Sequence, residues 1–217
     1  MKQYQAVFFD LDGTLMDTSM GVIQAIDYIV GTFQLPVLSE QEKYAFIGPP
    51  IQKSFQVHYG CTQERAWELA TAWRDAYKEK FLLEAIPYDG IYDLLRCLRQ
   101  KGIKTCVATN KREDYTLKLL GHFSFLPLFD CIAGSDFEGK RGKPDMIRLC
   151  MEQTGITDPK RCLMVGDTVG DAAAAKEAGV DFLGVTYGFG FTAGITSLAA
   201  NAVMMADGCA QIQEWLI

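Results

Sequence analysis

One stretch near the start of the chain reads Ala6-Val7-Phe8-Phe9-Asp10-Leu11-Asp12-Gly13-Thr14-Leu15. Its apolar run is typical of a strand buried on both faces of an α/β sheet, and such sheets bind ligands where their strands end. Because side chains alternate along a strand, Asp10 and Asp12 point to the same side. Two such carboxylates repel each other unless a proton, a metal or a cationic side chain compensates. A solvated Asp-x-Asp-Gly turn is the alternative interpretation of the same residues.

The composition is that of an ordinary globular protein. The 217 residues are 49% hydrophobic and 22% charged, which is enough for one large core and a small appendage. The net charge of −6 and the absence of a block rich in Lys and Arg argue against a nucleic-acid partner. An anionic substrate remains compatible, because a small phosphate ester needs only a local positive pocket. The oligomeric state, monomer or dimer, stays open.

The cysteine pattern and the apolar runs bear on the compartment. The seven cysteines are scattered, odd in number and never spaced as C-x-x-C, so we expect reduced thiols without a disulfide framework or a zinc site. No signal-peptide pattern opens the chain, and no apolar run approaches the length of a membrane span. We therefore expect a cytoplasmic protein with no membrane partner.

Helical spacing dominates residues 16–85. Apolar residues recur at helical intervals from Val22 to Phe33 and again from Trp67 to Phe81. Ser39 followed by Glu42 predicts a capping box that begins a helix, and Thr62 predicts a second helix start. The sequence therefore predicts an all-helical insert after the first strand.

The rest of the chain alternates between strands and helices. Apolar strand-like runs cover residues 104–109, 130–134, 161–167, 181–187 and 202–205, and helical patterns cover 90–101, 110–120, 144–154, 171–178 and 211–216. Strands that alternate with helices imply right-handed crossovers and a parallel sheet covered on both faces. We predict a Rossmann-like, doubly wound α/β core formed by residues 1–15 and 86–217, with the helical insert as a cap.

The turn Gly48-Pro49-Pro50 interrupts the helical insert and is followed by Lys53. Two prolines fix the backbone before a new helix begins. A plain connection between helices is one interpretation, and a loop that selects the substrate is the other. Under the second interpretation Lys53 is a candidate contact for an anionic ligand, and Tyr28 is a further candidate specificity residue.

Polar residues follow several of the predicted strands. Asp10, Thr109 and Asp167 end three strands, Asp171 follows at a helix start, and Lys143 directly precedes another helix. Because the carboxyl ends of central strands meet at one edge of a doubly wound sheet, we expect these side chains to gather there. So many acids need a cation, so a bound metal and a lysine are expected among them. Asp171 is placed to orient Lys143 or a metal-bound water.

This residue set suits phosphoryl transfer to a carboxylate nucleophile. Asp10, Asp167 and a backbone carbonyl, assigned to Asp12, offer the hard oxygen ligands that Mg²⁺ prefers. Asp10 would attack phosphorus to give an aspartyl-phosphate, and Asp12 would exchange protons with the leaving oxygen and then with water. Thr109 and Lys143 would hold the remaining phosphoryl oxygens as charge spreads in the transition state.

Four segments in this order resemble the motifs of the haloacid dehalogenase (HAD) superfamily. They are Asp10-Leu11-Asp12-Gly13-Thr14-Leu15-Met16-Asp17-Thr18, Thr109-Asn110-Lys111, Lys143-Pro144 and Gly166-Asp167-Thr168-Val169-Gly170-Asp171. The helical insert resembles the C1 cap type, and the chain length and the loop at Gly48-Pro49-Pro50 resemble the phosphoglycolate phosphatase-like branch. The resemblance implies Mg²⁺ dependence, the roles given above, metal contact by Asp167 with Asp171, and phosphate contacts from the backbone of Gly13 and Asn110. Lys140 is the alternative to Lys143.

Other activities of the same superfamily remain alternatives. Phosphoglycolate, a nucleoside 5′-monophosphate, a sugar phosphate and pyrophosphate all fit as small phosphorylated substrates. A sugar phosphomutase shares every core motif, and His58 would be its candidate proton relay. A phosphonate hydrolase would use Lys53 for a Schiff base, but Asp12 argues against that class. A receiver domain phosphorylated on aspartate is the non-enzymatic alternative, although such domains are about half this length and lack the insert.

Overall fold

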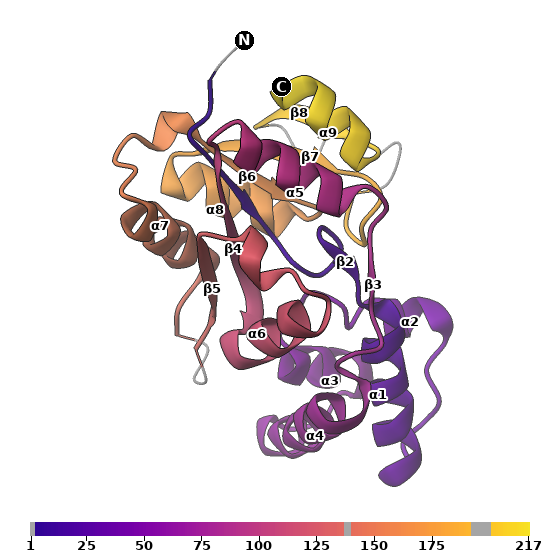
Figure 1. Cartoon of the computed structure of the whole chain (residues 1–217). Helices are drawn as coiled ribbons and strands as arrows, with labels where there is room; N and C mark the ends of the chain where they lie inside the picture. Colours follow the sequence, from indigo (N-terminus) through magenta and orange to yellow (C-terminus); the bar gives the residue numbers. More distant parts are fainter. Residues whose placement is uncertain (1–2, 137–139, 192–200) are drawn as a thin grey trace. The chain divides into compact units, whose positions relative to one another are not determined.

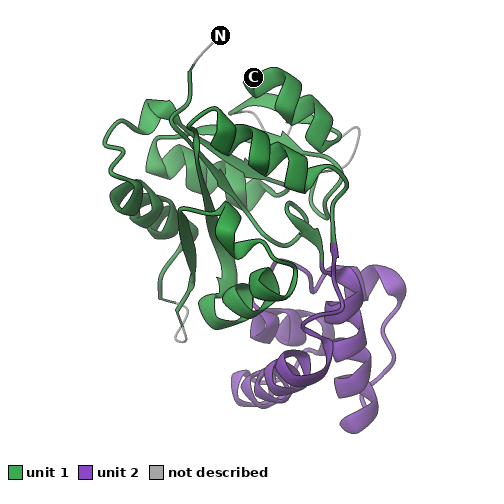
Figure 2. Cartoon of the chain, viewed as in Figure 1, with its two compact units in different colours: residues 1–17, 87–217 green, residues 18–86 purple. Residues whose placement is uncertain are grey.

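The computed structural model describes residues 3–136, 140–191 and 201–217. The chain forms two compact units, one of Met1–Asp17 with Pro87–Ile217 and one of Thr18–Ile86 (Figure 2). The division thus falls after residue 17 instead of residue 15, and after residue 86 instead of residue 85.

The first unit is built on a six-stranded parallel sheet with the order β5-β4-β1-β6-β7-β8. Its strands are β1 (Ala6–Phe9), β4 (Lys104–Arg112), β5 (Cys131–Ser135), β6 (Cys162–Gly166), β7 (Asp181–Val185) and β8 (Ala202–Ala206). The chain runs outward from β1 to β5, and then returns to the other side of β1 for β6 to β8. Such a reversal leaves a crevice at the carboxyl ends of the two strands that flank it, here β1 and β6.

Helices cover both faces of this sheet, which confirms the predicted doubly wound α/β fold (Figure 1). They are α5 (Ile91–Gln100) and α9 (Cys209–Leu216) on one face, and α7 (Lys143–Thr154) and α8 (Val169–Ala178) on the other. The side chain of Phe8 from β1 belongs to the core beneath α7 and α8, with Met146 and Ile147 of α7. All four residues of β1 are fully buried, because the strand is covered on both sides.

Helix ends in the first unit follow the sequence signals closely. α7 and α8 end at Gly155 and Gly179, both in the left-handed conformation that glycine adopts without strain. The remaining short elements are α6 (Glu113–His122) and the 3₁₀ helices η2 (Leu126–Leu128) and η3 (Pro159–Arg161). Several expected bounds differ. β4 continues beyond residue 109 to Arg112, with a register irregularity after Ala108, and β7 ends at Val185 instead of residue 187.

The second unit is helical, as predicted. It contains α1 (Ser19–Thr32), α2 (Glu40–Tyr44), α3 (Ile51–Tyr59), α4 (Gln63–Ala76) and the π-helix η1 (Tyr77–Phe81). Ser39 and Glu42 form the predicted capping box at the start of α2. The Thr62 hydroxyl accepts a hydrogen bond from the Arg65 N–H at the start of α4. Both helix starts are therefore confirmed.

Two short strands, β2 (Met16–Asp17) and β3 (Ile86–Pro87), pair where the chain leaves and rejoins the first unit. All seven cysteines are free thiols, four of them buried, which agrees with the expected absence of disulfides. Among the described residues, no helix is both long and apolar enough to cross a bilayer.

Candidate active site

Three buried carboxylates meet at the carboxyl ends of β1 and β6. Asp10 follows β1, Asp167 follows β6, and Asp171 lies in the first turn of α8. One carboxylate oxygen from each residue lies within 4.8 Å of the others. The structure thus brings together three of the acids that were expected at this edge.

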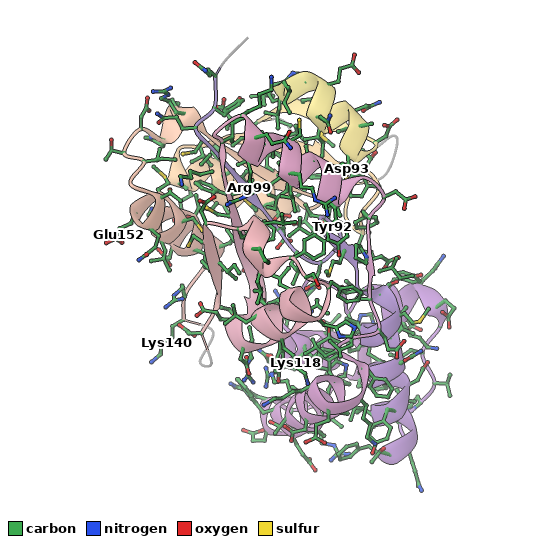
Figure 3. The ribbon with its side chains drawn as sticks, viewed as in Figure 1. Tyr92, Asp93, Arg99, Lys118, Lys140 and Glu152 are labelled. Atoms are coloured by element: carbon green, nitrogen blue, oxygen red, sulfur yellow. The ribbon has the colours of Figure 1, made fainter. Side chains whose placement is uncertain are left out.

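Lys143 joins this group as the first residue of α7. Its Nζ lies 2.9 Å from Asp10 Oδ1 and donates a short hydrogen bond to Asp171 Oδ1. The contact to Asp10 has the distance of an ion pair but not the direction of a hydrogen bond, so Oδ1 of Asp10 accepts none within the described chain. The alternative Lys140 lies on the surface (Figure 3).

Asp171 is held in place by its own helix start. Its Oδ2 accepts hydrogen bonds from the Thr168 N–H at 2.9 Å and the Thr168 hydroxyl at 2.6 Å. The Thr168 hydroxyl in turn caps α8 by accepting from the Asp171 N–H. A capping box thereby fixes the carboxylate that holds Lys143.

The pKa values of Asp10 and Asp167 are raised because both are buried and because one lysine does not balance the negative charge of three carboxylates. Burial raises the pKa of Asp10 to about 6, with Asp171 and Asp12 adding to the shift and Lys143 opposing it. Burial and the nearby Asp10 and Asp171 raise the pKa of Asp167 to about 7. Burial disfavours the charged form of Lys143, but Asp10 and Asp171 outweigh it and raise its pKa. A divalent cation at this position would offset the remaining negative charge.

Asp12 contacts a residue to which the sequence assigned no role. Lys111 Nζ lies 2.9 Å and 3.3 Å from the two carboxylate oxygens of Asp12. Lys111 follows the buried Thr109 by two residues, and the Thr109 hydroxyl accepts from the Lys111 N–H. Asn110 between them is exposed. The signal that was available is the position of Lys111 near the end of a central strand, beside a predicted site residue.

Gly13 is required at its position for two reasons. It has a φ of +80°, which L side chains rarely adopt, and a Cβ there would lie 2.3 Å from Asp167 Oδ2. Its N–H donates to the Met16 carbonyl at 2.9 Å. A phosphate contact by this amide, as the family resemblance implies, would require that hydrogen bond to break.

Asp167 has further partners that the sequence did not reveal. Its Oδ2 accepts from the N–H groups of Phe189 at 2.7 Å and Gly190 at 3.2 Å. The Thr14 hydroxyl lies 3.4 Å from its Oδ1. A Gly-Phe-Gly segment directly after a strand was the available signal, because paired glycines often mark a close backbone approach.

The cap candidates belong to the second unit. Gly48, Pro49 and Pro50 form an exposed turn with Pro50 at the N-cap of α3, and Lys53 is exposed in its first turn. Their assignment as specificity residues stays a prediction. The ring of His58 stacks on Phe46 at 4.9 Å, which is a packing role within this unit.

Comparison with known proteins identifies the family. The family model described as haloacid dehalogenase-like hydrolase matches residues 7–185, which include Asp10, Thr109, Lys143, Asp167 and Asp171. The chain belongs to this family. Membership confirms the predicted α/β fold and the predicted class, a HAD-type hydrolase with relatives named as phosphatases.

Similar proteins cover nearly the whole chain. A 5′-nucleotidase of Pseudomonas aeruginosa is 35% identical over 191 residues, which are 87% of this chain and 85% of that protein. A phosphoglycolate phosphatase of Caulobacter vibrioides is 30% identical over 86% of this chain and 80% of its own length. The crystal structure of a predicted phosphatase from Clostridium acetobutylicum superposes with a TM-score of 0.89 at 33% identity, and covers 99% of this chain and 98% of its own.

Proposed function

We propose that this protein is a Mg²⁺-dependent phosphatase that hydrolyses a small phosphate monoester through an aspartyl-phosphate on Asp10. The observation that carries the proposal is a buried cluster in which one lysine, Lys143, faces three carboxylates. When ionised, these carboxylates carry more negative charge than the lysine can balance. The HAD relatives named 5′-nucleotidase and phosphoglycolate phosphatase support the choice of a small phosphorylated metabolite as substrate.

The donor set fits a divalent cation with a preference for oxygen ligands. Oδ1 of Asp10 is buried and accepts no hydrogen bond from the described residues, and Asp167 offers a second buried carboxylate within 4.8 Å. The carbonyl of Asp12 is the proposed third protein ligand. When bound, Mg²⁺ would supply positive charge that offsets the repulsion between the Asp10 carboxylate and an anionic phosphate.

Asp10 is the proposed nucleophile because it is the acid directly at the end of the central strand. Its N–H donates to the Val165 carbonyl at 3.0 Å, which fixes the backbone between β1 and β6. The pair with Lys143 favours the ionised form that attack requires. A carboxylate oxygen of Asp10 would bond to phosphorus as the bond from phosphorus to the leaving oxygen breaks.

Asp12 is the proposed acid and base. It gives a proton to the leaving oxygen in the first step. In the second step it takes one from the water that attacks phosphorus, which releases phosphate and restores the Asp10 carboxylate. Lys111 is a positioning residue in this proposal, because its two contacts to the Asp12 carboxylate limit how that side chain can turn.

Lys143 and Thr109 are the proposed contacts for the phosphoryl oxygens that neither attack nor leave. Lys143 is held by Asp171, so its ammonium group needs little reorganisation when charge develops on phosphate. The backbone N–H of Asn110, an exposed residue of β4, is a further proposed donor. The N–H of Gly13 is available only if its hydrogen bond to the Met16 carbonyl breaks.

Release of inorganic phosphate tests the proposal. The purified protein is incubated with Mg²⁺ and a panel that contains 2-phosphoglycolate, nucleoside 5′-monophosphates, hexose phosphates and pyrophosphate. We expect turnover of at least one monoester, loss of turnover with EDTA, and a loss of at least about 10³-fold in Asp10→Asn. Hexose phosphate isomers without free phosphate would instead indicate a phosphomutase. A fully active, folded Asp10→Asn protein would contradict the assignment of the nucleophile.

A further inference from the structure

The segment after β7 wraps around Asp167. The N–H groups of Phe189 and Gly190 both donate to Asp167 Oδ2, at 2.7 Å and 3.2 Å. The N–H of Phe191 donates to the main-chain carbonyl of the same aspartate at 2.7 Å. Three successive backbone amides thus point at one fully buried residue.

The two glycines of this loop leave no space for a side chain. A Cβ on Gly188 would lie 2.2 Å from the Gly13 carbonyl oxygen and 2.4 Å from Asp167 Cβ. A Cβ on Gly190 would lie 2.5 Å from the Asp167 carbonyl oxygen. Neither glycine has a positive φ, so close backbone approach is the requirement at both positions.

These contacts determine how the Asp167 carboxylate is turned. Two amide donors occupy Oδ2 and fix the plane of the carboxylate, because each hydrogen bond is directional. The other oxygen, Oδ1, is approached only by the Thr14 hydroxyl, at the long distance of 3.4 Å, within the described part of the chain. A carboxylate held in this way needs no rotation and loses little side-chain entropy when it takes a cation.

We propose that the loop Gly188-Phe189-Gly190 is the positioning element of the metal site, and that its amides set the affinity of the protein for its divalent cation. This inference rests on the proposed function of Asp167 as a metal ligand. In this proposal the loop acts through Asp167, to which its amides donate hydrogen bonds. It therefore changes the Mg²⁺ concentration that the protein needs and leaves the rate at saturating Mg²⁺ almost unaltered.

Calorimetric titration of the metal-free protein with Mg²⁺, without substrate, tests the inference. We expect Gly190→Ala to raise the dissociation constant about 10- to 100-fold, because a Cβ there pushes the loop off Asp167. The matched control is Gly208→Ala in the same unit, since that glycine has an extended backbone and nothing within 4 Å of its Cβ position. In steady-state assays Gly190→Ala should move the half-saturating Mg²⁺ concentration by the same factor.

Further variants separate the two proposals. Asp167→Asn must weaken Mg²⁺ binding, and an unchanged dissociation constant there overturns both the metal role of Asp167 and this inference. Weakened binding in Asp167→Asn with an unchanged value in folded Gly190→Ala overturns the inference alone. If Gly190→Ala does not fold, Phe189→Ala decides, because the Phe189 ring lies against Gly13 and its loss loosens the loop. We then expect binding weakened at least about threefold, and an unchanged value counts against the loop.

Discussion

Lys143 in the first unit and Lys43 in the second are both buried lysines held by two carboxylates, but their partners differ in exposure. Lys43 Nζ lies 2.9 Å from Asp27 and 2.9 Å from Glu40, whose side chains are 49% and 72% exposed. The partners of Lys143, Asp10 and Asp171, are 10% and 0% exposed. Water therefore solvates the acids around Lys43. The acids around Lys143 are shielded from water, so their negative charge is balanced by the lysine and, in the proposed function, by a divalent cation.

This difference separates a structural ion pair from the pair that we propose takes part in catalysis. Asp27 and Glu40 in the second unit are solvated, so keeping them ionised has a small free-energy cost. Lys43 links α2 to α1 through its ion pair with Asp27. In the first unit Asp167 adds a third buried charge within reach of Asp10 and Asp171. Excess buried charge of one sign is costly to maintain, and proteins keep it where a ligand of the opposite sign binds.

Matched removal of the two ammonium groups should show the largest effect. Lys143→Met leaves buried carboxylates uncompensated, so we expect a loss of about 3–5 kcal/mol in the free energy of unfolding and about 10²- to 10³-fold in kcat/KM. Lys43→Met keeps the side-chain stem and should cost at most about 1 kcal/mol with unchanged kcat/KM. Urea unfolding and phosphate release measure both effects. Equal losses of stability and of kcat/KM in the two variants would contradict the different roles assigned to the two lysines.

The pH dependence of stability sharpens the same contrast. The pKa values of Asp10 and Asp167 are raised to about 6 and about 7, so the folded metal-free protein retains protons that the unfolded chain releases. Its free energy of unfolding should therefore fall as pH rises from about 4 to about 7, by a total on the order of 7 kcal/mol. Urea titrations in EDTA at about pH 5 and about pH 8 measure this fall. Mg²⁺ should restore stability mainly at the higher pH, where the carboxylates are ionised.

Asp12→Asn provides the control for that measurement. The Asp12 side chain is partly exposed and pairs with Lys111, so its removal should leave the fall in stability between about pH 5 and about pH 8 in place. A metal-free protein whose stability rises over this interval would contradict the assignment of the buried acids.

Lys111 tests whether the partly buried pair that it forms with Asp12 also serves catalysis. Lys111→Met frees the Asp12 carboxylate to turn, and we expect kcat to fall about tenfold with little change in KM. Lys111→Arg should recover part of the loss, because it restores a cation near Asp12. A structural role alone would lower stability without moving the pH profile of kcat, so the profile is recorded for all three proteins.

The smallest effect is expected at a helix start in the second unit. Ser39→Ala removes the hydroxyl that caps α2 and should lower the free energy of unfolding by about 1 kcal/mol. Phosphate release at saturating substrate should not change. A loss well above this value would mean that α2 supports more of the second unit than its five residues suggest.

Local signals in the sequence predicted much of this molecule. The apolar run before Asp10 placed the central strand, because a strand buried on both faces tolerates few polar residues. Lys143 was preferred over Lys140 from its place directly before a helix, and the structure holds it against Asp10 and Asp171. Ser39 with Glu42 marked a helix start, because a capping box needs only residues of one turn.

The contacts that were missed depend on tertiary geometry. Lys111 reaches Asp12 across 99 positions of the chain, from a part of β4 whose register with β5 is irregular. The amides of Phe189 and Gly190 reach Asp167 from a loop beyond the next strand, and the two glycines of that loop were the only local sign of this approach. Backbone hydrogen bonds to a site are therefore the part of its chemistry that sequence conceals most.

The pairing of β2 with β3 has a consequence for how this chain can be rearranged. The Leu15 carbonyl accepts from the Tyr88 N–H at 3.2 Å, so the two ends of the helical insert leave the first unit as neighbours. β1 pairs directly with β4, and no strand of the six-stranded sheet comes from residues 18–86. The insert is thus an exchangeable module. A different helical segment joined at the same two positions would leave the sheet, the carboxylates and the lysine of the first unit unchanged.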